Sequence, residues 1–146
     1  MRGTLVYEWT EATSWRQIGY VKSHDEVYEV VRNRYGFYAF GKRRVRRLDE
    51  QRGKWNDVWT AHGGLSITNA DCVSVGDDIY AVQPQENDDK REKTDIFRIR
   101  GDATQKVATV DGVSSGAAAV DDAIYIRFYT LHRYGTSTNY LDSTCS

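Results

Sequence analysis

The chain has 146 residues, of which 40% are hydrophobic and 12% aromatic. This composition suits one ordinary domain with a buried core and excludes a disordered protein. The formal net charge of −1 gives no general attraction to nucleic acid or to acidic membranes. No segment approaches the roughly 18 apolar residues of a membrane-spanning helix. We therefore expect neither nucleic acid nor a membrane as a partner.

The residues that most often carry chemistry are scattered. Cys72 and Cys145 are far apart and lack the spacing of a metal site, so we expect reduced thiols and a cytoplasmic location. His24, His62 and His132 lie in different parts of the chain and form no metal-ligand pair. No nucleophile elbow or phosphate-binding loop is present. The sequence predicts no cofactor, no metal and no catalytic residue, and hence a protein that is not an enzyme.

Short strands bounded by polar turns recur along the chain, and helical periodicity is nearly absent. The first element is an outer hairpin over residues 4–20. Three rounds follow, over 24–60, 66–110 and 113–142, and each is predicted to hold an inner hairpin and then an outer hairpin. Within the second round, the charged run 83–94 is predicted to be a loop.

The rounds form a repeat. Each inner hairpin ends in a strand with a tyrosine between aliphatic residues, and these tyrosines are Tyr38, Tyr80 and Tyr125. Their spacing of about 40 to 45 residues, with four strands per period, is typical of the blades of a β-propeller. A four-stranded blade buries its two faces by stacking against its neighbours. We therefore expect the repeated tyrosines, and the tryptophans Trp15 and Trp55, to lie in the core between blades.

The first round carries the residues of a known repeat. It has the strand 36–41 with Gly41, then the strand 45–49, and then Trp55. This order resembles the kelch repeat, in which an apolar strand with two glycines is followed by a hairpin with a tyrosine and later a tryptophan. The second glycine is missing in every round, which leaves other propeller families open. The resemblance implies an all-β fold, a partial β-propeller of about three and a half four-stranded kelch-like blades over residues 1–146.

A closed propeller usually has four to eight blades. Three and a half blades leave apolar faces uncovered, and uncovered apolar faces favour association. We therefore expect that a second copy or a partner chain completes the ring, or that the chain is a fragment of a longer propeller, and we do not expect an isolated monomer.

The predicted function is that of a non-catalytic protein-interaction module, which is the role the kelch resemblance implies. Alternatives are a carbohydrate-binding propeller, whose loop aromatics such as Trp9 would stack on sugar rings, and a purely structural subunit. The basic run 42–47 fits a solvated strand, an acidic protein partner or, least well, nucleic acid. The candidate binding residues are the arginines of that run and aromatic residues of loops: Arg43, Arg44, Arg46, Trp59, Tyr129 and Tyr134.

Overall fold

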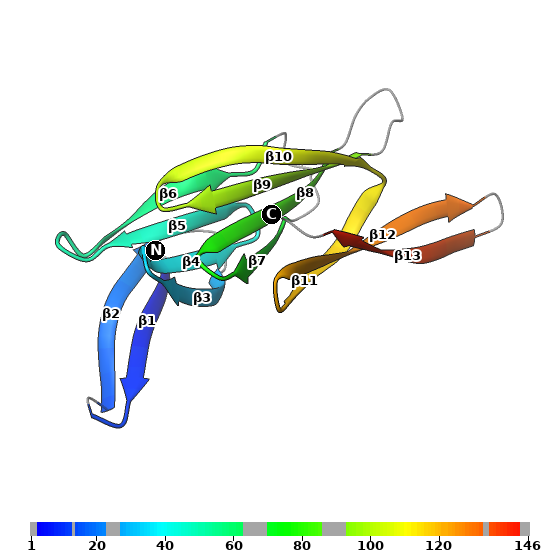
Figure 1. Ribbon diagram of the computed structural model, residues 1–146. Coiled ribbons are helices and arrows are strands. Elements are labelled where there is room, and N and C mark those ends of the chain that lie inside the picture. The colour runs from blue at the N-terminus through cyan, green and yellow to red at the C-terminus, as the bar shows by residue number, and fades with distance from the viewer. Residues whose placement is uncertain are drawn as a thin grey trace. The chain divides into compact units, whose positions relative to one another are not determined.

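A computed structural model describes residues 3–12, 14–22, 27–62, 70–85, 93–132 and 135–143. These residues form thirteen strands and no helix, so the predicted all-β class is confirmed. The strands make four antiparallel sheets in which each strand pairs with its neighbours in the chain (Figure 1). The chain divides into two compact units, residues 1–60 and 61–146, and each is described by itself.

The first unit holds a two-stranded and a four-stranded sheet. The hairpin consists of β1 (Gly3–Thr10) and β2 (Ser14–Lys22). The four-stranded sheet follows in the order β3-β4-β5-β6, with the bounds β3 (Val27–Asn33), β4 (Gly36–Gly41), β5 (Arg44–Asp49) and β6 (Lys54–Thr60).

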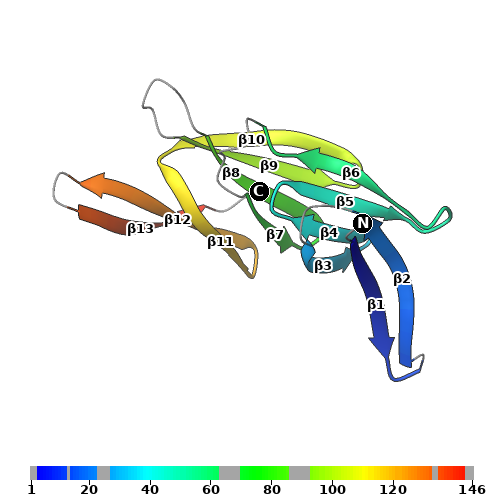
Figure 2. The same ribbon diagram turned by 180° about the vertical axis from the view of Figure 1, so that it is seen from behind.

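The second unit holds a four-stranded and a three-stranded sheet. The four-stranded sheet has the order β10-β9-β8-β7, with the bounds β7 (Asp71–Val75), β8 (Asp78–Gln85), β9 (Lys93–Arg100) and β10 (Ala103–Asp111). β10 bends into the last sheet, which consists of β11 (Val113–Val120), β12 (Ala123–His132) and β13 (Gly135–Ser143) (Figures 1 and 2).

The last sheet differs from its predicted four strands. In the third round, the inner hairpin was expected to end and the outer hairpin to begin near residue 127. Instead, β12 continues past residue 127 as one strand of ten residues. In the first round, Gly41 ends β4 before β5 begins at Arg44. The corresponding segment 127–130 has the sequence Arg-Phe-Tyr-Thr, whose aromatic and β-branched residues favour a continuous strand.

In the first unit, the hairpin packs on one face of the four-stranded sheet. Val6 and Ile18 of the hairpin join a core cluster with Phe37, Ala39, Leu48 and Trp55. On the opposite face of that sheet, the register places Tyr38, Phe40 and Val45, and all three are fully buried. Both faces of β4 are therefore buried, which matches its continuous apolar run 37–40.

A β-bulge lets β6 bury a tryptophan on each face. Trp59 lies opposite Val45 and Trp55 lies opposite Leu48, but the register shifts between these pairs at Val58. Two residues four apart lie on the same face of a regular strand, and one extra residue moves them to opposite faces. Trp55 therefore joins the cluster with Val6, and Trp59 lies on the face of Phe40.

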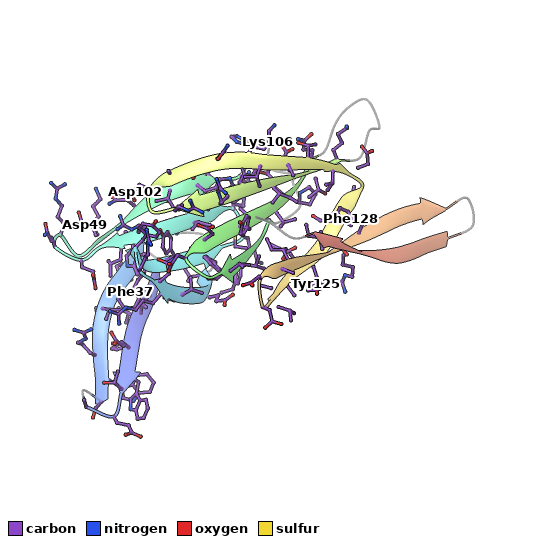
Figure 3. The ribbon with its side chains drawn as sticks, viewed as in Figure 1. Phe37, Asp49, Asp102, Lys106, Tyr125 and Phe128 are labelled. Carbon is purple, nitrogen blue, oxygen red and sulfur yellow. The ribbon has the colours of Figure 1, made fainter. Side chains whose placement is uncertain are left out.

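In the second unit, β11 and β12 pack on the four-stranded sheet. Ile124, Ile126 and Phe128 of β12 form one cluster with four residues of β7, β8 and β9, namely Val73, Tyr80, Val82 and Ile96. Figure 3 labels Phe128 on β12, together with Tyr125 from the opposite face of that strand. At an apolar transfer value of roughly 25 cal/mol per Å², side chains of this size each contribute about 1.5–3 kcal/mol by burial.

The repeated tyrosines have different environments. Tyr38 is 0% and Tyr80 2% exposed, so their predicted place in the core is confirmed. Tyr125 is 38% exposed, and its predicted burial is wrong. The reason is positional, because Tyr125 lies on the face of β12 that points away from Ile124 and Ile126, and those two residues make the contact with β7–β10.

The corner between β10 and β11 depends on Gly112. Its φ is +107°, and a Cβ placed there would lie 3.1 Å from Cδ1 of Phe128. We expect Gly112→Ala to lower the free energy of unfolding by about 2–4 kcal/mol, from backbone strain and from crowding against Phe128. Gly36→Ala is the matched control, because Gly36 has a φ of +114° and nothing within 4 Å of the added Cβ. Urea unfolding measures both variants, and equal losses would contradict the role of the Phe128 contact.

Candidate functional site

Large hydrophobic residues line the outer face of the β1–β2 hairpin. The pairs Leu5–Tyr20 and Trp9–Trp15 lie directly opposite each other across the two strands, and Tyr7 lies between them on the same face. Their exposed fractions are 52% for Leu5, 49% for Tyr7, 55% for Trp9, 72% for Trp15 and 42% for Tyr20. We call these five residues the aromatic face. Because Val6 points to the core from the other side of β1, the face is the free surface of the hairpin.

The aromatic face is large for an exposed apolar surface. With about 150–250 Å² per aromatic side chain, its exposed part is on the order of 400–500 Å². Patches of this size on soluble proteins commonly mark interaction sites, whereas single exposed hydrophobic residues do not. Tyrosine and tryptophan are also the side chains that most often dominate binding energy at protein interfaces.

A groove of about 410 Å³ borders the same hairpin. Its walls are β1 and β3, with Val6, Ile18, Val30 and Phe37 among its apolar lining. In the described part of the chain, β1 pairs only with β2, and β3 is an edge strand. The groove therefore combines apolar side chains with the unpaired backbone edge of β1, the two features that receive an added β-strand. Arg32 lies at its rim with its guanidinium 5.1 Å from the centre of the Phe37 ring.

A second hollow lies on the outer face of the last sheet. It measures about 290 Å³ and is lined by Gly116, Ala117, Ala118, Tyr125 and Arg127. Arg127 donates from Nε to Ser115 Oγ at 2.8 Å and from Nη2 to the Ser115 carbonyl oxygen at 3.0 Å. Its Nη2 lies 3.4 Å from the position of a Cβ on Gly116, so the missing side chain gives the guanidinium room to lie across β11. We call Gly116, Ala118, Tyr125 and Arg127 the Arg127 face.

The positive charge of Arg127 also affects the pKa of Asp71. Burial raises the pKa of the Asp71 carboxyl above its ordinary value of 3.8, and the positive charge of Arg127 opposes that rise. With the raised pKa, the folded state binds the proton more tightly than the unfolded state does. The contribution of Asp71 to stability is therefore lost as the pH rises from 3.8 through the folded-state pKa.

This linkage predicts a pH-dependent difference between the wild type and Asp71→Asn, whose amide does not titrate. The free energy of unfolding of the wild type minus that of the variant should decrease as the pH rises through this window. Urea unfolding at a series of pH values measures it. A difference that increases with pH would mean that the charge of Arg127 lowers the pKa of Asp71 by more than burial raises it.

Two arginines of the basic run 42–47 form ion pairs with Asp57, a residue of the same sheet. Arg46 is buried, and its Nε donates to Asp57 Oδ1 at 3.0 Å. The exposed Arg44 reaches Oδ2 of the same carboxylate at 3.5 Å. Arg43 is partly buried at the start of β5. An acidic partner would have to compete with Asp57 for these two arginines, and the buried Arg46 fits neither a binding surface nor a solvated strand.

The aromatic residues predicted to bind a ligand have different environments in the structure. Trp59 is only 4% exposed, so its predicted role as a surface for ligand stacking is wrong. The bulge at Val58 described above turns the Trp59 ring into the sheet face of Val45. The side chain of Tyr129 and the whole of Tyr134 lie outside the described residues. Trp9, by contrast, is exposed and belongs to the aromatic face. The predicted burial of Trp15 is wrong, because this residue lies opposite Trp9 on the same face and is 72% exposed.

A polar cluster surrounds the buried carboxylate of Asp95 on β9. Thr109 Oγ1 donates to Asp95 Oδ1 at 2.6 Å, and the Gln85 amide donates to Asp95 Oδ2. The ammonium of Lys106 lies 4.0 Å from Oδ1. The carboxylate thus has donors on both oxygens, and an arrangement of this kind fixes neighbouring strands to each other.

Comparison with known proteins assigns the chain to no family. No protein-family model matches it, and no curated protein shows significant similarity. In the described ranges, no helix has the length and hydropathy to cross a membrane. The same ranges contain no cluster of three histidine, cysteine, aspartate or glutamate residues suited to a metal ion. Cys72 is a buried, reduced thiol on β7.

Proposed function

We propose that this chain is a non-catalytic protein-interaction module made of kelch-like propeller blades, and that it binds protein through the aromatic face. The observation that carries the proposal is the row of five exposed hydrophobic side chains on one face of the β1–β2 hairpin. Such a surface is stable in water only at a cost in free energy, which a protein partner removes by covering it.

The arrangement of the sheets supports the blade interpretation. Two of them are meanders of four consecutive antiparallel strands, β3–β6 and β7–β10, as in a propeller blade. Each packs face to face with a neighbouring sheet of its own unit through a continuous hydrophobic cluster. A rigid stack of this kind holds exposed side chains in fixed positions, which favours recognition.

A carbohydrate ligand is the second candidate, because Trp9 and Trp15 are exposed as a pair on opposite strands. Aromatic rings can stack on the apolar faces of sugars. The aromatic face is broader than one sugar ring requires, and most of its groups are apolar. A protein partner therefore accounts for more of the face.

Selection from a displayed library of folded domains and peptides tests the proposal. The bait is the whole protein at low concentration, and the binders are then compared on the wild type and on the variant Trp9→Thr/Trp15→Thr. Threonine suits a strand, and both tryptophans are largely exposed, so the variant should keep its unfolding midpoint. We expect selected binders to saturate the wild type and to bind the variant about tenfold or more weakly in calorimetry.

The control variant is Val107→Thr, which changes an exposed hydrophobic residue on β10 of the second unit and leaves the five residues of the aromatic face unchanged. It should bind the selected partners as the wild type does. Binders that ignore the tryptophan substitutions would contradict the assigned surface. Saturable binding on a glycan array that the tryptophan variant loses, without any protein binder, would favour the carbohydrate alternative.

A further inference from the structure

The two ends of the described chain present complementary surfaces. The aromatic face of β1–β2 offers large rings and no positive charge among its five residues. The Arg127 face of β11–β12 offers a hollow of about 290 Å³ that is lined by small residues, by Tyr125 and by the Arg127 side chain. We propose that the aromatic face of one copy docks on the Arg127 face of a second copy, in a head-to-tail contact. The inference rests on the proposed function and names a second copy as the partner.

The repeated tyrosine supports this choice of partner. Tyr38 and Tyr80 lie at repeat-equivalent positions of their sheets and are buried. Tyr80 is buried where the next sheet in the chain, β11–β12, covers it. Tyr125 is the third member of the series, and it is 38% exposed on the face of β12 that points away from the β7–β10 sheet. A sheet from a second copy would cover Tyr125 as the β11–β12 sheet covers Tyr80.

The chemistry of the two faces also fits. Arg127 is held by Ser115 across Gly116 and remains exposed, so its guanidinium is fixed before binding. A guanidinium over a tryptophan or tyrosine ring contributes a favourable cation–π interaction. The chain already uses this pairing twice, with Arg32 over Phe37 and Arg34 over Tyr35 at 5.1 and 4.8 Å.

The size of the surfaces is adequate. A stable protein interface buries roughly 800 Å² on each partner, with an apolar core and a polar rim. The exposed part of the aromatic face, on the order of 400–500 Å², would form such a core. Because the two faces differ, the contact is heterologous, and repeated copies would close into a ring or continue as a chain.

Mixing two variants tests the proposal. Trp9→Thr/Trp15→Thr blocks the aromatic face, and Ala118→Glu places a charge in the hollow of the Arg127 face. Light scattering after size exclusion should show the wild type growing in mass with concentration. Each variant alone should remain near the 16.7 kDa of one chain, with an association about tenfold or more weaker. An equimolar mixture should form a species of two chains, since one intact face of each kind is present.

Three outcomes would overturn the proposal: a wild type that stays monomeric, a single-face variant that associates like the wild type, or a mixture that remains monomeric. If Ala118→Glu does not fold by circular dichroism, Tyr125→Thr takes its place in the mixture. Val107→Thr should associate like the wild type. A monomeric wild type that still binds selected partners through its tryptophans would remove this inference and leave the proposed function intact.

Discussion

Phe128→Ala should lower the free energy of unfolding of the second unit by about 3–5 kcal/mol. Phe128 is buried in the cluster that joins β12 to the β7–β10 sheet, and it also lies against the Gly112 corner. Removing the ring would leave a cavity between the two sheets, which the rigid backbone of the strands cannot close. Guanidinium unfolding followed by circular dichroism gives the loss.

The matched control is Tyr125→Ala, three residues earlier on the same strand. Tyr125 lies on the outer face and is 38% exposed, so its removal should lower stability by only about 1 kcal/mol or less. If both variants lost the same free energy, the two faces of β12 would be equally buried. That result would contradict the outward direction of the Arg127 face.

Asp95→Ala should destabilise the protein by about 2–4 kcal/mol. The substitution removes the buried Asp95 carboxylate, which accepts hydrogen bonds from the half-buried Gln85 amide and from the exposed Thr109 hydroxyl. Hydrogen bonds to a charged group contribute about 1.5–3 kcal/mol each. Thermal unfolding at neutral pH measures the effect.

Lys106→Ala serves as its control, because the Lys106 ammonium is exposed and reaches Asp95 only at 4.0 Å. We expect this variant to change the free energy of unfolding by no more than about 0.5 kcal/mol. A loss equal to that of Asp95→Ala would mean that the ion pair, and not the two hydrogen bonds, holds the cluster together.

The sequence was sufficient to predict most of the strands, but not all of their ends or their surroundings. β8 and β9 extend into the predicted loop 83–94, and β12 is one strand where two were expected. Alternation of apolar and polar residues, with glycine and aspartate at the turns, identified the hairpins and the buried Tyr38 and Tyr80. Tyr125 has the same local pattern, yet it is exposed. Its burial would need a further sheet on that face of β12, and local alternation contains no information on such a sheet.

The exposed and buried tryptophans show the same limit. Leu5, Tyr7 and Trp9 alternate with Val6, so the pattern places them on one face of a strand. Since both faces contain apolar residues, the pattern does not say which one reaches solvent. Trp59 was expected at the surface, but a one-residue bulge at Val58 turned it inward. A bulge of this kind leaves no reliable mark in a sequence, because almost any residue can occupy it.

The buried thiol of Cys72 is a natural probe for the transient opening of the β7–β8 hairpin. The chain has only two cysteines, so a Cys145→Ser background leaves Cys72 as the single site for a thiol reagent. Cys72 is 5% exposed and lies opposite Ala81, so the reagent reaches its sulfur only when this hairpin transiently opens. The labelling rate of Cys72 then reports how often the hairpin opens. A ligand or a second copy that stabilises the second unit would lower this rate.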